Sequence, residues 1–145
     1  MPKTSLPSFF CQYSNNCYEC CKQTEMTLTE EEVKAIEALG FKIEEFIVLE
    51  DFWLVLRNID KHCFFLKDGK CSIYDVRPKG CRYYPLILDL EKDQIIIDND
   101  CPHVKYVNKE VFHELSSEIR NHVIQLLLEQ QKRRERKNKR KKRKI

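Results

Sequence analysis

Eight cysteines in a chain of 145 residues limit its possible folds more than any other feature. They form two clusters and one isolated position: Cys11, Cys17, Cys20 and Cys21, then Cys63, Cys71 and Cys81, and finally Cys101. Cysteines at this density most often form disulfides or coordinate metal. Residues 1–10 contain no apolar run like that of a secretory signal. We therefore expect a cytoplasmic protein, where thiols stay reduced, and we favour metal over disulfides or buried thiols.

The charge is divided unevenly along the chain. Residues 132–145 contain eleven Lys and Arg residues and one Glu, a net charge of +10. Removing them from the totals of 26 basic and 23 acidic residues leaves 15 basic and 22 acidic residues in positions 1–131, a net of −7. No run approaches the ~18 apolar residues needed to span a bilayer. We expect one domain over residues 1–131 and a basic tail over 132–145, either a frayed helix extension or disordered.

Two stretches of the chain have the signature of helices. Residues 29–40 begin with Thr29 as an N-cap and Glu32 placed to close a capping box, and Gly40 can end the helix. Val33, Ile36 and Leu39 supply its apolar face. The second helix is expected at about 109–131, where apolar residues recur every three or four positions: Val111, Leu115, Ile119, Val123, Leu126 and Leu127.

Three pairs of apolar runs predict β-hairpins. The first joins residues 46–49 and 52–57 around Glu50-Asp51, and the last joins 86–90 and 94–98. The middle one joins 63–66 and 71–74 around Asp68-Gly69, a strong hairpin signal that should bring Cys63 and Cys71 towards each other.

A short helix should deliver Cys81, with Asp75 as its cap and Pro78 in its first turn. Residues 1–25 show no periodicity and are expected to be a loop. The fold class is therefore α+β: a small cysteine-rich domain with short β-hairpins, one N-terminal helix and a long C-terminal helix around a metal centre.

Thiolates are soft donors that suit zinc or iron–sulfur clusters, and both are commonly closed by four ligands. Eight cysteines allow two four-cysteine sites, or one cluster with spare thiols. Adjacent side chains such as Cys20 and Cys21 point to opposite sides in extended backbone, so they serve two sites or different atoms of one cluster, unless they form a vicinal disulfide. All eight are candidate metal ligands: Cys11, Cys17, Cys20, Cys21, Cys63, Cys71, Cys81 and Cys101.

Other residues near the cysteines have weaker claims to a role. His62 and His103 adjoin Cys63 and Cys101, but a supporting role behind the ligands or a surface position is favoured over ligation. His113 and His122 are expected to be structural or exposed. Arg77 and Arg82 could stabilise an anionic thiolate centre or form ion pairs with carboxylates such as that of Asp75. Three tyrosines are expected to shield the centre from water: Tyr74, Tyr83 and Tyr84.

The cysteine pattern resembles a known family. Cys17-x2-Cys20-Cys21, followed by Cys63, then Asp68-Gly69-x-Cys71-Ser-Ile-Tyr-x2-Arg77-Pro78-x2-Cys81, is similar to the YkgJ-type CxxCxxCC cysteine-cluster family, to which flagellin lysine N-methylase is also similar. Cys11 departs from the pattern, because it lies six residues before Cys17 instead of three. The resemblance covers about residues 11–102 and implies a zinc or iron centre, the latter including a [4Fe-4S] cluster.

Three functions are compatible with this sequence. The first is a metal-binding protein whose centre holds a small core together. The second is an iron–sulfur redox or methyl-transfer-linked enzyme or subunit, although three glycines and no glycine-rich strand–helix turn argue against a complete methyltransferase. The third is a nucleic-acid-associated protein in which Lys132–Lys144 contacts RNA, DNA or another anionic partner weakly, the alternative being a solubilising tail.

Overall fold

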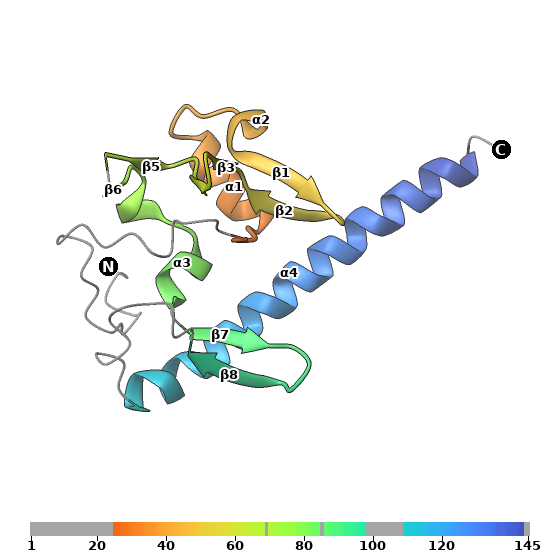
Figure 1. Cartoon of the computed structure of the whole chain (residues 1–145). Coiled ribbons are helices and arrows are strands. Elements are labelled where there is room, and N and C mark those ends of the chain that lie inside the picture. The colour runs from red at the N-terminus through yellow and green to blue at the C-terminus, as the bar shows by residue number, and fades with distance from the viewer. Residues whose placement is uncertain (1–24, 69, 85, 98–108, 144–145) are drawn as a thin grey trace.

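The computed structural model describes residues 25–68, 70–84, 86–97 and 109–143, the side chains of 109–112 and 141–143 excepted. Its elements are short antiparallel hairpins, three short helices and the long helix α4 (Lys109–Arg143). Figure 1 shows α4 along one side of the molecule, with hairpin β7–β8 beside its N-terminal half and the tip of β1–β2 further along. The predicted α+β class, with its short hairpins and long C-terminal helix, is confirmed.

Helix α1 (Glu30–Glu37) forms as its sequence predicts. The Glu32 N–H donates to Thr29 Oγ1 at 3.2 Å, and Glu32 Oε1 accepts from the Thr29 N–H at 2.9 Å, which completes the capping box. The helix ends before Gly40, whose φ of 108° favours glycine. Val33 and Ile36 are buried, but Leu39 lies past the helix end and is exposed, so its assignment to the apolar face was wrong.

The first hairpin is displaced by one residue from the expected position. Strands β1 (Ile47–Glu50) and β2 (Trp53–Leu56) pair Glu50 with Trp53, so the turn is Asp51-Phe52 instead of Glu50-Asp51. Both turn residues have positive φ, as the tight turn that matches strand twist requires. Phe46 belongs to the preceding helix α2 (Ile43–Phe46).

The expected middle hairpin is two hairpins. Strand β3 (Asn58–Ile59) pairs with β4 (His62–Cys63), and β5 (Leu66–Lys67) pairs with β6 (Lys70–Cys71). Cys63 therefore lies opposite Asn58, and Cys71 opposite Leu66, which corrects the prediction that one hairpin brings the two cysteines together. The cause is a second two-residue turn, Asp60-Lys61, in which both residues have positive φ.

The segment after β6 carries Cys81 on a short helix, as predicted, although the details differ. A 3-10 turn, η4 (Tyr74–Val76), contains Asp75, and α3 (Lys79–Tyr83) follows with Pro78 as its N-cap residue. Asp75 is thus not the cap of α3, and Pro78 precedes its first turn. Strands β7 (Leu86–Asp89) and β8 (Gln94–Ile97) form the expected last hairpin.

Helix α4 buries part of the stripe that its apolar residues predict, with Val123 half-buried, and it also buries polar side chains. Leu115, Ile119 and Leu126 are buried, but Leu127 is 37% exposed, and His122 and Glu129 occupy the inward positions. The helix continues through the basic region to Arg143, so residues 132–143 extend the helix. The division into a domain at 1–131 and a tail at 132–145 stays a prediction.

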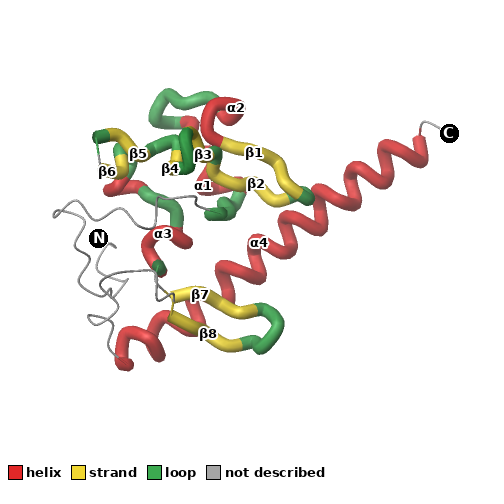
Figure 2. Tube along the Cα trace, in the orientation of Figure 1, coloured by secondary structure: helices red, strands yellow, loops and turns green. Residues whose placement is uncertain are grey.

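Two hydrophobic cores form on either side of α3. The first contains Phe46, Phe65 and Cys63, with Phe41 and Phe64 packed edge-to-face on Phe65 at 5.1 Å between ring centroids. The second lies between α3, β7, β8 and α4: Tyr83, Leu86, Ile95, Leu115 and Ile119. Figure 2 shows that loops connect most of these short elements. Among the described helices, none is long and apolar enough to cross a membrane.

Candidate metal centre

Three of the eight candidate ligands lie in the described residues, all as thiols. Cys63 is buried on β4, and Cys71 on β6 and Cys81 on α3 are half-buried. The other five lie outside the described residues, as does His103: Cys11, Cys17, Cys20, Cys21 and Cys101. Within the part of the chain that the structure describes, no group of three or more His, Cys, Asp or Glu side chains could hold a metal ion. The donors have the chemistry that zinc or iron requires, but these three thiols do not form a site by themselves.

Cys63 and Cys71 share the first core. Cys63 is 6% exposed among its buried residues, and Cys71 packs against it. The backbone around them is held by two cross-links: the Phe64 N–H donates to Arg57 O at 2.8 Å, and the Ser72 N–H donates to Phe65 O at 2.7 Å. These hydrogen bonds and the packing of Phe64 on Phe65 hold the two hairpins that carry Cys63 and Cys71.

Cys81 is joined to the same region through Met26. A Cβ placed on Gly80 would overlap Met26 Sδ, so glycine is the residue that lets α3 approach this side chain so closely. Met26 also packs against the first core. It therefore lies between the helix that carries Cys81 and the core that holds Cys63 and Cys71.

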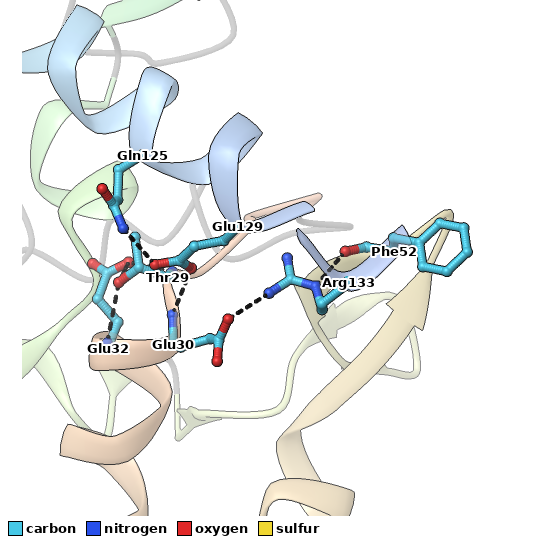
Figure 3. Close-up of polar contacts among 7 residues, drawn as sticks. All are labelled: Thr29, Glu30, Glu32, Phe52, Gln125, Glu129 and Arg133. Carbon is cyan, nitrogen blue, oxygen red and sulfur yellow. Dashed lines mark hydrogen bonds and ion pairs between the residues drawn. The ribbon is translucent and has the colours of Figure 1, made fainter. Parts of the chain in front are cut away.

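Two side chains from other helices hold α3 at its ends. Glu32 Oε2 on α1 accepts from the Lys79 N–H at 2.5 Å, at the first residue of α3. At the other end, Tyr83 packs edge-on against His122 of α4, with 5.8 Å between ring centroids. Helix α1 is attached to α4 in turn, because Glu129 Oε1 accepts from the Glu30 N–H at 2.9 Å (Figure 3).

Tyr83 and His122, which meet where α3 contacts α4, are both held in their neutral forms. Burial, reinforced by Lys79, lowers the pKa of His122, while Glu32 and Glu129 act in the opposite direction. His122 Nε2 is buried without a hydrogen-bond partner among the described residues. Burial also raises the pKa of Tyr83, with the carboxylates of Glu118 and Glu32 adding to the effect and Arg82 opposing it. This contact is apolar in character although both rings can ionise.

Of the histidines beside the cysteines, His62 is the one that the structure describes. Its Nδ1 lies 2.8 Å from Asp60 O, and because a carbonyl can only accept, Nδ1 is the donor in this contact. With Cys63, it lines an open cavity of about 370 Å³ between the β3–β4 and β5–β6 hairpins. His62 and Cys63 are adjacent on β4 and differ in burial, His62 being half-buried and Cys63 buried.

The arginines and tyrosines around α3 have mainly local contacts. Arg77 lies over the ring of Tyr74, with 4.0 Å to the centroid, and donates from Nη1 to Tyr74 O at 2.9 Å. Arg82 donates from Nε to Arg77 O at 3.2 Å. These contacts hold the segment that precedes α3 against the helix. Their predicted electrostatic role at a thiolate centre stays a prediction, as does the shielding role of the tyrosines.

These features define a small cysteine-rich α+β domain whose described thiols come from two hairpins and a short helix. A family model matches residues 11–118, and the chain belongs to that family, CxxCxxCC, described as "Putative zinc- or iron-chelating domain". No curated protein and no solved structure matches the chain.

Sequence reasoning missed the three contacts that hold α3. Glu32 was assigned to its own capping box, because that pattern is local, whereas its bond to Lys79 N joins residues 47 positions apart. Met26 and His122 likewise have no local pattern that indicates their contacts. The sequence offered one signal of such a contact: Gly80 lies inside the short helix that carries Cys81, and a glycine inside a helix often has a packing reason.

Proposed function

We propose that this protein holds a zinc or iron centre through its clustered cysteines, and that the metal fastens α3 to the first core. The proposed ligands are Cys63, Cys71 and Cys81 together with cysteines of the N-terminal cluster and Cys101. The observation that carries this proposal is the contact of Met26 with Gly80. Met26 is five residues after Cys21, and five residues span at most about 18 Å. This length of chain allows Cys21 to reach the neighbourhood of Cys81.

Cys101 also follows a described strand by a short length of chain. Ile97, four residues before it, pairs with Leu86 of β7, which follows α3 closely in the chain. Met26, which follows the N-terminal cysteines, and Ile97, which precedes Cys101, thus both lie close to α3. Because no three described His, Cys, Asp or Glu side chains form a group that could hold a metal ion, a four-ligand centre would need at least two ligands from the undescribed cysteines.

The expected role of such a centre is structural. Two small cores, connected through α3 and a few hydrogen bonds, leave a chain of this size with limited stabilisation of its own. A metal that joined Cys81 to a thiol of the first core would cross-link α3 to that core, and its binding free energy would then contribute to folding.

Anaerobic purification, metal analysis and absorption spectroscopy test the proposal. Stoichiometric zinc in a colourless protein would exclude redox chemistry at the centre. A brown protein with acid-labile sulfide would indicate an iron–sulfur cluster and favour the redox or methyl-transfer-linked alternative. Cys71→Ser and Cys81→Ser should each lose metal, whereas the neighbouring Ser72→Ala should keep it. Full metal content in both cysteine variants would overturn the proposed ligand set.

The basic end of α4 favours a second proposal, contact with nucleic acid. Figure 1 shows this end of the helix projecting past the β1–β2 hairpin. Four exposed basic residues recur at helical spacing along it: Lys132, Arg136, Lys139 and Arg140. A rigid row of cations can contact successive phosphates without reading bases.

Replacing these four residues with Gln tests the second proposal. Binding to mixed-sequence DNA should weaken, and the slope of log K against log salt should fall by about 0.9 for each lost phosphate contact. The control makes the same charge change on the body: Lys34, Lys42, Lys61 and Lys70 to Gln. Equal loss in both variants, or no binding by the unaltered protein, would refute a role for this helix end.

A further inference from the structure

The carboxylate of Glu32 serves two helices at once. Oε1 accepts from the Thr29 N–H at 2.9 Å within α1, and Oε2 accepts from the Lys79 N–H at 2.5 Å at the start of α3. Figure 3 shows Glu32 beside Thr29, at the end of α1 that faces α4. Both oxygens are thus engaged with backbone donors, which makes this side chain a bridge and not a candidate metal ligand.

Helix α3 needs an external partner of this kind. It has only five residues, and its N-cap, Pro78, makes no side-chain hydrogen bond to it. The first N–H groups of a helix have no partner within the helix, and so short a helix is marginal without tertiary contacts. Glu32 supplies an ionised acceptor to the first of these groups, two residues before Cys81.

We propose that Glu32 is a positioning residue for the metal ligand Cys81. This inference rests on the metal-binding function proposed above. By fixing the first residue of α3 against α1, Glu32 sets the place of the Cys81 thiol before metal arrives, so that less conformational freedom is lost on binding. Glu32 acts on the metal only through this backbone contact.

The remaining contacts of α3 explain why the effect should be local. Met26 packs closely against Gly80, and Tyr83 packs against His122, and neither contact is made by the Glu32 side chain. Loss of Glu32 should therefore loosen the start of α3 and leave the core that holds Cys63 and Cys71 in place.

Thiol reactivity in the metal-free, reduced protein tests this directly. Glu32→Ala removes both bonds, whereas Thr29→Ala disrupts the cap of α1 and leaves the bond to Lys79 N. Alkylation of each cysteine is followed by mass spectrometry. Cys81 should react about fivefold faster in Glu32→Ala than in Thr29→Ala, the change expected for losing one partly exposed charged hydrogen bond. The rates of Cys63 and Cys71 should match between the two variants.

A second variant deletes the same bond from its other side. Lys79→Pro removes the donor N–H, and proline is tolerated at a first helical position, where Pro78 already has the extended ψ of 155° that a following proline requires. Lys79→Ala keeps the N–H and controls for the lost side chain. Lys79→Pro, but not Lys79→Ala, should raise Cys81 reactivity and speed metal release to a chelator.

The outcomes separate this inference from the function on which it rests. Equal Cys81 rates in Glu32→Ala and Thr29→Ala, or a parallel rise for all three thiols, would overturn the role of Glu32. Lys79→Pro behaving like Lys79→Ala would do the same. Absence of metal from the unaltered, anaerobically purified protein would instead overturn the proposed function, because the alkylation rates do not depend on metal.

Discussion

Arg133 should contribute far more stability than Arg134, although the two are neighbours with the same charge. The Arg133 side chain is 13% exposed, and it donates from Nε to Phe52 O at 2.7 Å and from Nη1 to Glu30 Oε2 at 3.2 Å (Figure 3). The Arg134 side chain is 40% exposed, and its Nη2 lies 3.4 Å from Oδ1 of the exposed Asp51. Arg133→Ala and Arg134→Ala therefore change the charge equally and the packing unequally.

The structure sets the magnitude of the difference. The charged hydrogen bond to Phe52 O is worth about 1.5–3 kcal/mol, and the half-exposed ion pair with Glu30 adds less than about 1 kcal/mol. Part of this is offset because Arg133 Nη2 is buried without a hydrogen-bond partner among the described residues, and alanine removes that donor. We expect Arg133→Ala to cost about 2 kcal/mol, or roughly 4–8 °C in Tm. Arg134→Ala should cost about 0.5–1 kcal/mol, for an exposed ion pair and a cation–π contact with Phe52.

Urea denaturation followed by circular dichroism, with all proteins in one metal state, measures these free energies of unfolding. Arg133→Lys is the sharper control, because one ammonium group cannot reproduce the fork that reaches Phe52 O and Glu30 together. It should lose more than half of what Arg133→Ala loses. An Arg134→Ala variant as unstable as Arg133→Ala, or an Arg133→Lys variant as stable as the unaltered protein, would refute this account of how α4 is fastened to the β1–β2 hairpin.

Three further predictions concern other parts of the chain. Burial lowers the pKa of His122 in the folded state. The free energy of unfolding should therefore be at its full value above about pH 7 and should fall as the pH drops through about 6.5, where the unfolded chain takes up the proton. In urea titrations, His122→Gln should flatten this pH dependence, and His113→Gln should not. Phe65→Ala should cost about 3–5 kcal/mol, because the side chain is 1% exposed among the aromatic rings of the first core; calorimetry showing a loss below about 1 kcal/mol would contradict this packing. Lys61→Gly should raise stability by about 0.5 kcal/mol, because Lys61 is exposed and has a φ of 69°; a lower urea midpoint would be inconsistent with that conformation.

Features encoded over a few residues were predicted well. The capping box of α1 depends on Thr29 and Glu32, three positions apart, and the structure has both of its hydrogen bonds. The β7–β8 hairpin and the helix carrying Cys81 follow from similarly local patterns. The CxxCxxCC resemblance, read from cysteine spacing, agrees with the family to which the chain belongs.

Errors arose where a second local turn or a distant hydrogen-bond partner decided the structure. The turn at Asp68-Gly69 was recognised, but Asp60-Lys61 contains no glycine, and its turn separated Cys63 from the hairpin of Cys71. On α4, Leu127 was assigned to the buried stripe because apolar residues recur every three or four positions, but it is 37% exposed. The inward positions are His122 and Glu129 instead, and Glu129 is accommodated because it accepts from the Glu30 N–H. Buried polar groups of this kind depend on a partner that helical periodicity does not reveal.

Local residue order was therefore sufficient to indicate an α+β cysteine-rich domain of the CxxCxxCC family, because turns, caps and cysteine spacing act over a few residues. Tertiary packing decided how α3 is held, since its contacts with Glu32, Met26 and His122 join residues far apart in the chain. It also decided that the described thiols lie on three separate elements, where Cys63, Cys71 and Cys81 belong to no group of three described donors that could hold a metal ion. Such long-range contacts exist only once the cores have formed, because their geometry follows from packing and not from spacing.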